Sequence, residues 1–400
     1  MEIRYYPIHS SLKNDYVINS SSSNLLTKIN ALLETEIVSS SLEDLYHGDL
    51  ALILIESGGS EEEFLKIKSK LKEPYYLLTY GANNSLAASL EILSYIKRYG
   101  EVGEVLHGKE ENIAKRIKSI LGLNKVNDTR IYHRLGVIGA PSNWLISSNV
   151  NYEEVKEKFN IDLVNISINE LIAVYTSLNV VLKDGRYNAE YDAQELTKAY
   201  RLYKAMKEIV KQYNLEGVTI RCFDLISSIK TTACLSLASL NEKGVVGCCE
   251  GDIPTFITQY VVKSELKQSS FQVNPCYIDS EENTVIFAHC TLPLDMCESY
   301  KFDTHYESNI GVGIKGELKE GDVTVVKVSP DLKYYFVSEG AIIKNLNRKD
   351  LCRTQIKVQL DENVDYFLKS PLGNHHVVIY GHKKEELSNY FNFLGLKSII

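Results

Sequence analysis

Short apolar runs alternate with amphipathic stretches over the first third of the chain. Residues 50–55 and 75–79 have the length of strands. Each run is followed by a stretch with apolar residues at helical spacing: the first stretch begins near Ser60 and the second near Asn83. An alternation of strand and helix is typical of a parallel sheet with helices on both faces. The pattern therefore predicts an N-terminal α/β domain over residues 1–134.

The same alternation continues over residues 135–265, which we expect to form a second α/β domain. An apolar run at residues 135–139 enters a loop that contains Trp144, the only tryptophan of the chain. Trp144 is either a hydrophobic plug or one wall of a substrate pocket. The other expected elements are helices at residues 152–159, 168–178, 189–213 and 227–240 and strands at residues 218–220 and 245–246.

Beyond residue 266 the pattern changes to short alternating segments separated by glycine and charged turns. Such spacing predicts an antiparallel β-rich domain over residues 266–400, which ends with a helix at residues 384–394. The predicted fold class is therefore α/β, with two Rossmann-like parallel-sheet domains followed by a β-rich C-terminal domain. The expected strands of this last domain are residues 284–287, 310–314, 322–328 and 333–337.

The composition narrows the classes of function. The chain has 400 residues, enough for two to four domains, and 44 basic against 52 acidic side chains give a net charge of −8. This charge argues against a nucleic-acid partner. No apolar run approaches the roughly 20 residues that span a bilayer, and the start lacks a signal-peptide pattern, so we expect a soluble, cytoplasmic protein without a membrane partner. The eight cysteines form no CxxC pair, which argues against a disulfide framework or a zinc knuckle.

Two carboxylates follow the apolar residues 245–246. Glu250 comes at the carboxyl end of an expected strand, the place where α/β proteins hold ligands, and a buried carboxylate is costly without a cationic partner. Asp252 stands just ahead of Pro254, which suits the first turn of a helix, so Asp252 fits a helix N-cap or a residue that supports the site. We expect Glu250 to be the functional carboxylate of the two.

Histidines occur at the ends of later segments. His289 follows an apolar run and is either a metal ligand or a satisfied, half-buried histidine. Side chains of the adjacent His375 and His376 face opposite ways on an extended segment, so one can bind a metal while the other orients it or contacts a ligand. His305, with Glu307 beside it, is a further candidate for substrate contact.

The donor types indicate the metal. Carboxylate oxygen together with imidazole nitrogen suits Mn²⁺ or a similar divalent cation. Cys290, next to His289, leaves zinc as a minor alternative. Cys248, Cys249 and Cys290 are otherwise expected to be small buried residues beside a pocket.

Five segments, in one order, resemble the L-fucose/L-arabinose isomerase family. They are residues 250–252, 271–274, 288–289, the His305 segment with its trailing glycines, and 375–376. The resemblance implies the fold given above, a homo-oligomer (trimer or hexamer) with active sites near subunit contacts, and a manganese or other divalent ion that binds neighbouring sugar oxygens. By position, Glu250 matches a metal-binding catalytic carboxylate and His289 matches a histidine ligand. The late histidine ligand of the family is matched by His376 in preference to His375.

Asn274 departs from the family pattern. It stands 24 residues after Glu250, where the family has its second catalytic carboxylate. An amide oxygen can bind a hard cation, but it cannot act as a general base. Either Asp279, Glu307 or His305 supplies the missing proton-transfer group, or the correspondence with the family is displaced by a loop, or the chain no longer isomerises sugars.

We predict a metal-dependent aldose–ketose isomerase that acts on a monosaccharide through an enediol intermediate, which a divalent ion can stabilise. The alternatives are a non-catalytic carbohydrate-binding or regulatory protein of the same fold, and a metal-assisted lyase or epimerase acting on a sugar acid. The predicted site consists of the catalytic residues Glu250, Asn274 and His305, the substrate contacts Trp144, Asp252, Glu307 and His375, and the metal ligands Glu250, Asn274, His289 and His376.

Overall fold

A computed structural model describes residues 2–10, 15–33, 35–127, 132–182 and 190–400. The chain divides into two compact units, Met1–Arg130 and Ile131–Ile400. Among the helices of the described ranges, none is both long and apolar enough to cross a membrane.

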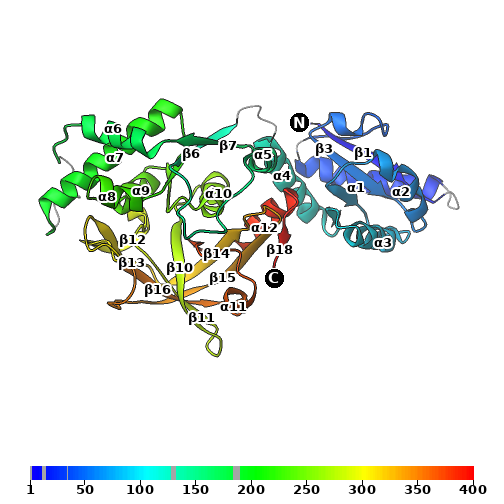
Figure 1. Ribbon diagram of the computed structural model, residues 1–400. Coiled ribbons are helices and arrows are strands. Elements are labelled where there is room, and N and C mark those ends of the chain that lie inside the picture. Colours follow the sequence, from blue (N-terminus) through cyan, green and yellow to red (C-terminus); the bar gives the residue numbers. More distant parts are fainter. Residues whose placement is uncertain (1, 11–14, 34, 128–131, 183–189) are drawn as a thin grey trace. The chain divides into compact units, whose positions relative to one another are not determined.

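The first unit is a five-stranded parallel sheet covered by helices on both faces (Figure 1). The strand order is β2-β1-β3-β4-β5, and every neighbouring pair is parallel. Buried residues of α1 and α4 pack on one face, and those of α2 and α3 pack on the other. The bounds are β1 Ile3–Ile8, α1 Asp15–Leu33, β2 Ile37–Ser39, β3 Leu50–Ile55, α2 Glu61–Ile67, β4 Tyr75–Leu78, α3 Ser85–Arg98, β5 Gly103–Leu106 and α4 Glu110–Asn127. The predicted parallel α/β architecture is confirmed.

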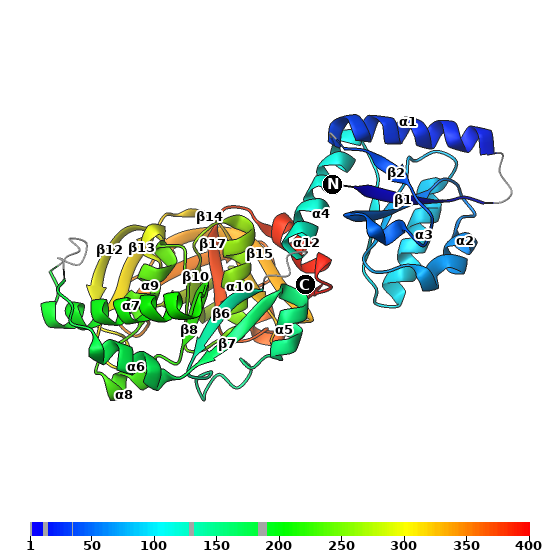
Figure 2. The same cartoon turned by 90° about the horizontal axis from the view of Figure 1, so that it is seen from above.

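The second unit begins with a four-stranded parallel sheet in the order β7-β6-β8-β9. Helices α6, α7 and α9 pack on one face of this sheet. Helix α10 contacts β8 and β9 and also two later strands, β14 (Gly321–Val328) and β17 (His376–Tyr380), so it lies between the two sheets of the unit (Figure 2). The bounds are β6 His133–Ile138, α5 Tyr152–Phe159, β7 Ile161–Ile166, α6 Ile168–Ser177, α7 Ala193–Tyr213, β8 Gly217–Ile220, α8 Phe223–Ser228, α9 Cys234–Glu242, β9 Val246–Cys249 and α10 Ile253–Val261.

The single helix predicted over residues 227–240 is wrong, because two helices, α8 and α9, occupy this region. Between them Lys230 has a left-handed backbone with φ of 52°. A residue in this conformation ends a helix, so the chain turns before α9 begins.

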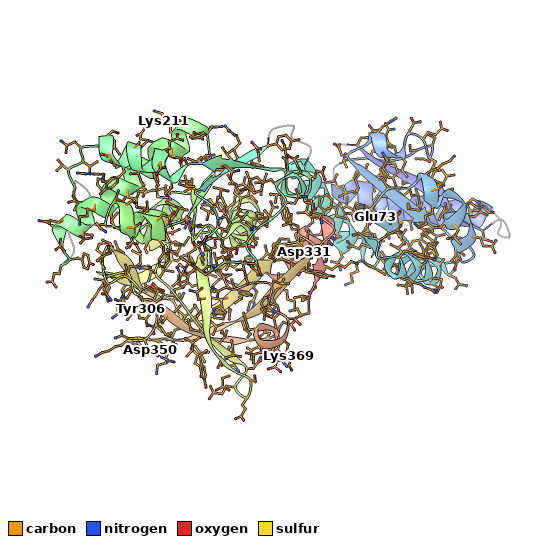
Figure 3. All side chains as sticks on the ribbon, viewed as in Figure 1. Glu73, Lys211, Tyr306, Asp331, Asp350 and Lys369 are labelled. Atoms are coloured by element: carbon orange, nitrogen blue, oxygen red, sulfur yellow. The ribbon has the colours of Figure 1, made fainter. Side chains whose placement is uncertain are left out.

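The rest of the second unit is built around an antiparallel β barrel, beside which two strands, β12 and β13, pair as a separate sheet. Strands β14, β17, β10, β11, β16 and β15 pair in this order, and β14 also pairs with β15, which closes the ring. Large apolar side chains such as Phe287 and Phe336 fill it, while the charged side chains of Asp350 and Lys369 are exposed (Figure 3). The bounds are β10 Phe271–Asp279, β11 Thr284–His289, β12 Cys297–Asp303, β13 Gly313–Leu318, β14 Gly321–Val328, β15 Tyr334–Asn345, β16 Thr354–Leu360, α11 Tyr366–Lys369, β17 His376–Tyr380, α12 Lys384–Phe393 and β18 Lys397–Ser398. The predicted β-rich C-terminal region is confirmed.

Candidate metal centre

Glu250 lies in a strained turn directly after β9. Its φ is +63°, a left-handed conformation that costs a non-glycine residue on the order of 1–3 kcal/mol, and Gly251 follows with φ of +71°. The backbone N–H of Ser142 donates to the carbonyl of Glu250 at 3.0 Å. A Cβ on Gly251 would lie 2.7 Å from the carbonyl oxygen of Ala140, so the turn packs tightly against the loop after β6. These contacts hold the Glu250 carboxylate in one direction.

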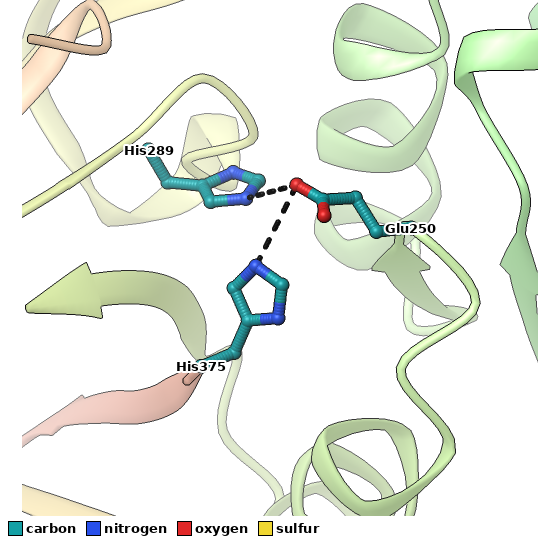
Figure 4. Close-up of side chains that lie close together, drawn as sticks. All are labelled: Glu250, His289 and His375. Atoms are coloured by element: carbon teal, nitrogen blue, oxygen red, sulfur yellow. Dashed lines mark ion pairs between the residues drawn. The ribbon is translucent and has the colours of Figure 1, made fainter. Parts of the chain in front are cut away.

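Three segments that are distant in the sequence bring their side chains together at this turn (Figure 4). Oε1 of Glu250 lies 3.6 Å from Nε2 of His375 and 3.9 Å from Nε2 of His289. One ligand atom from each of the three residues falls within 4.8 Å of the others. In the described residues this is the one group of three or more His, Cys, Asp or Glu side chains that could hold a metal ion.

Both histidines of the cluster are held by a neighbour on the outer side of the ring. Nδ1 of His375 donates to Oδ2 of Asp252 at 2.8 Å, and Nδ1 of His289 lies 2.8 Å from the hydroxyl of Thr291. The inner nitrogen of His375, Nε2, is buried and has no hydrogen-bond partner. In the neutral ring, with the proton on Nδ1, this nitrogen would present a lone pair to the oxygen of Glu250, so that two acceptors would face each other. A divalent cation between them fits these residues.

The electrostatics of the cluster follow from burial and close charges. Burial opposes the charge of Glu250, but the neighbouring His375 and His289 lower its pKa to about 2. Burial and the nearby His375 lower the pKa of His289 to about 4. Burial would lower the pKa of His375 too, but its contacts with Asp252 and Glu250 raise it to about 9. A bound cation would have to displace the proton from Nε2 of His375.

The structure corrects the order of preference between the two tandem histidines. His375 joins the cluster, whereas His376 points the opposite way, as the alternation of an extended segment requires. Nδ1 of His376 donates to the carbonyl of Asn374 at 3.1 Å, and its Nε2 lies 3.0 Å from the hydroxyl of Tyr366. Because both ring nitrogens already have partners, His376 has no lone pair left for a metal.

Asp252 is the N-cap of α10, as predicted, and its Oδ1 accepts from the backbone N–H of Thr255 at 3.0 Å. The same oxygen lies 3.4 Å from Nζ of Lys327. Lys327 was not among the residues expected at the site, although a lysine inside the apolar run of residues 322–328 is itself a signal of a buried charge with a partner.

Trp144 has a role that neither sequence interpretation included. The residue is 52% exposed, so it is not a buried plug. Its Nε1–H donates to Oε2 of Glu250 at 2.8 Å. The indole also packs edge-on against Phe223, which in turn packs edge-on against the ring of His305.

His305 and Glu307 form an ion pair, with 3.0 Å between Nε2 and Oε2. Burial would lower the pKa of His305, but Glu307 raises it above the ordinary value, and the charge of Glu250 acts in the same direction. Nδ1 of His305 lies 3.0 Å from the hydroxyl of Ser308, so both of its nitrogens are engaged. The Glu307 side chain is 46% exposed, so it is the solvent-accessible member of the ion pair.

The remaining candidates lie outside the cluster. Oδ1 of Asn274, on β10, accepts from Nδ2 of Asn374 at 3.0 Å. Asp279 lies at the other end of β10, where its side chain accepts from the backbone N–H groups of Glu281 and Glu282 at 3.1 and 3.0 Å. Asp279 therefore stabilises a turn. The thiols of Cys248, Cys249 and Cys290 are buried, and the cluster itself contains no thiol ligand.

No family model matches the chain. A protein named sulfoquinovose isomerase from Priestia megaterium (strain ATCC 12872 / QMB1551) is 23% identical over 314 residues, which cover 72% of this chain and 68% of that protein. Another protein of this name, from Clostridium sp. (strain MSTE9), is 24% identical over 344 residues, which cover 82% and 72%. A third, from Alkalicoccus urumqiensis, is 25% identical over 131 residues, which cover 31% and 29%.

These similarities show that the chain is an enzyme, an isomerase, and they support a sugar aldose–ketose isomerase. The prediction of an enzyme is confirmed, which sets aside the non-catalytic alternative. The resemblance to sugar isomerases is confirmed at that level, whereas the fucose/arabinose branch stays a prediction.

Proposed function

We propose that this isomerase is metal-dependent, converts an aldose into a ketose through an enediol intermediate, and holds its ion with Glu250, His289 and His375. The observation that supports the proposal most is the buried Nε2 of His375, which has no hydrogen bond and faces Oε1 of Glu250 at 3.6 Å. One oxygen and two imidazole donors without a thiolate suit Mn²⁺ or a similar ion.

The chain's own side chains divide the remaining work. When bound, a divalent ion would polarise sugar oxygens and so acidify a hydrogen on the adjacent carbon. The indole of Trp144 donates to Glu250 and keeps the Glu250 carboxylate in one position throughout the reaction. Glu307, which is half-exposed and paired with His305, carries the proton between C1 and C2 in place of the carboxylate that Asn274 replaces.

The substrate is proposed from the relatives and from a cavity lined in part by the loops that also carry Trp144 and His375. A cavity of about 620 Å³ is lined by residues from three loops, among them Ile146, Asp331 and Gly373. Ile146 follows Trp144 by two residues, and Gly373 precedes His375 by two. The far end of a monosaccharide would occupy this cavity. Sulfoquinovose is the first candidate, because the similar proteins carry its name. The proposed enzyme is a cytoplasmic homo-oligomer, a trimer or hexamer.

The test is a substrate panel of sulfoquinovose and neutral aldoses, run in D₂O with Mn²⁺ and, separately, with a chelator. The proposal expects a ketose product that carries deuterium from the solvent, loss of turnover with the chelator and recovery when Mn²⁺ is restored. NMR identifies the product. Full turnover in the chelated enzyme would refute metal dependence, and carbon–carbon cleavage or inversion in place of a ketose would favour a lyase or an epimerase.

A further inference from the structure

Lys327 is a fully buried lysine that the proposed reaction does not use. It lies on β14, its side chain is 1% exposed, and it is among the largest buried side chains of the described residues. A buried ammonium group is costly unless it is paired and hydrogen-bonded. Its position therefore depends on its partners.

Those partners all come from the N-terminus of α10. Nζ of Lys327 donates to the hydroxyl of Thr255 at 2.5 Å and lies 3.4 Å from Oδ1 of Asp252. The backbone N–H of Thr255 donates to the same Oδ1 at 3.0 Å. Lys327 and the first turn of the helix thus fix one oxygen of the carboxylate.

The other oxygen of Asp252 points at the metal cluster. Oδ2 accepts from Nδ1 of His375 at 2.8 Å, and Asp252 and His375 are both buried, at 1% and 0% exposure. The hydroxyl of Thr255 also donates to the backbone carbonyl of His375 at 3.4 Å. The same small group of side chains therefore contacts both the ring and the backbone of His375.

We propose that Asp252 and Lys327 are positioning residues, which together fix the tautomer and the ring orientation of His375 so that its Nε2 lone pair faces Glu250. The inference rests on the proposed function, because it assigns the support of one proposed metal ligand. Asp252 keeps the proton of His375 on Nδ1, and Lys327 prevents the carboxylate from rotating away. Carboxylate partners of metal-binding histidines typically change metal affinity about 10- to 100-fold.

A purely structural role for these residues makes different predictions. In that case Asp252 only caps α10 and neutralises Lys327, and metal affinity follows the stability of the fold. Asp252→Ser separates the two roles, since serine is also a good N-cap but is too short to reach His375. The double variant Asp252→Ser/Lys327→Met removes both buried charges and so avoids leaving one of them unpaired.

The experiment titrates the full-length protein with Mn²⁺ in a calorimeter, without substrate, and records the melting temperature and the absorption spectrum with Co²⁺ in place of Mn²⁺. Asp252→Ser should bind Mn²⁺ about 10- to 100-fold more weakly and alter the Co²⁺ spectrum. The double variant should melt closer to the wild type than Lys327→Met does, yet still bind about 10-fold or more weakly. Lys357→Met, which removes an exposed ion pair with Glu282, is the matched control and should bind like the wild type.

Two results would overturn the inference while the proposed function stands. One is a wild-type Mn²⁺ affinity in folded Asp252→Ser, and the other is recovery of wild-type affinity in the double variant, each with a wild-type protein that binds Mn²⁺. A wild-type protein that binds no divalent ion would refute both the positioning role and the metal dependence.

Discussion

At the scale of single residues, the cluster depends on which atom of each side chain is already bonded. One carboxylate oxygen of Glu250 accepts a hydrogen bond from the indole of Trp144, and the other lies near the two histidines. Nδ1 of His375 donates to Asp252, and Nε2 of the same ring faces Glu250. The hydrogen bonds to Trp144 and Asp252 leave Oε1 of Glu250 and Nε2 of His375 facing each other. These two atoms, with Nε2 of His289, define a site for one cation.

Trp144→Phe tests the outer bond of Glu250. The variant keeps a ring that can pack against Phe223 but removes the N–H donor, and a hydrogen bond to a charged group contributes about 1.5–3 kcal/mol. We expect turnover to fall by roughly 10-fold or more, with the melting temperature almost unchanged because Trp144 is half-exposed. Steady-state kinetics and a melting curve measure both, and unchanged kinetics would show that the indole bond is dispensable.

The sequence located Glu250 and His289, because both follow apolar runs and strand ends gather at one edge of a sheet. It favoured His376 over His375 as the late ligand, whereas His375 is the one that joins the cluster. The alternation of an extended segment says that they face opposite ways, but the face that meets the site depends on how β17 pairs with β10 and β14. That register involves residues about 50 and 100 positions away, so a local pattern does not contain it.

At the scale of elements, the turn between β9 and α10 supplies two of the residues around His375. Glu250 and Gly251 both adopt left-handed backbone, and Asp252 then begins α10. Because the strand end and the helix cap are only two residues apart, Glu250 and Asp252 lie on opposite sides of the His375 ring. The spacing Glu250-Gly251-Asp252 thus has a geometric reason, and the N-cap part of it was predictable from Pro254.

Gly251→Ala tests the rigidity of this turn. At φ of +71° an alanine is strained, and its Cβ would lie 2.7 Å from the carbonyl oxygen of Ala140. We expect a loss of more than about 1 kcal/mol in the free energy of unfolding, together with weaker Mn²⁺ binding, because Glu250 moves. Gly395→Ala is the control, since its φ is +78° but nothing lies within 4 Å of the added methyl group. Equal stability losses and unchanged Mn²⁺ binding in the two variants would contradict the tight packing of the turn.

At the scale of the whole molecule, every residue of the cluster and of its support belongs to the second unit, residues 131–400. Within it, α10 contacts both the parallel sheet and the barrel, so the site depends on the packing of two sheets. The parallel sheets and the β-rich region were predictable from the period of the apolar residues. Closure of six strands into a barrel was not, because it depends on the pairing of β14 with β15 and on strands that are not consecutive in the sequence.

The stability of the metal-free protein should have a maximum near pH 6.5. The pKa of His375 rises from 6.5 to about 9 on folding, so its contribution is complete below pH 6.5 and is lost as the pH rises to 9. The pKa of His289 falls to about 4, so its contribution is complete above pH 6.5 and is lost as the pH falls to 4. Each change corresponds to roughly 3 kcal/mol.

Urea unfolding between pH 4 and 9 measures this curve. Saturating Mn²⁺ should remove the loss on the alkaline side, because a bound ion needs His375 neutral. His375→Gln should remove the same loss without metal. A metal-free protein whose stability rises steadily from pH 6.5 to 9 would contradict the assignment.

The most direct test of the account is a Mn²⁺ titration of the wild type, His375→Gln and His376→Gln, with turnover measured on the same samples. The wild type should bind one ion per chain at the cluster. His375→Gln should lose both the ion and turnover, whereas folded His376→Gln should keep the ion. Mn²⁺ binding and turnover at wild-type levels in His375→Gln would show that the isomerase works without this metal site.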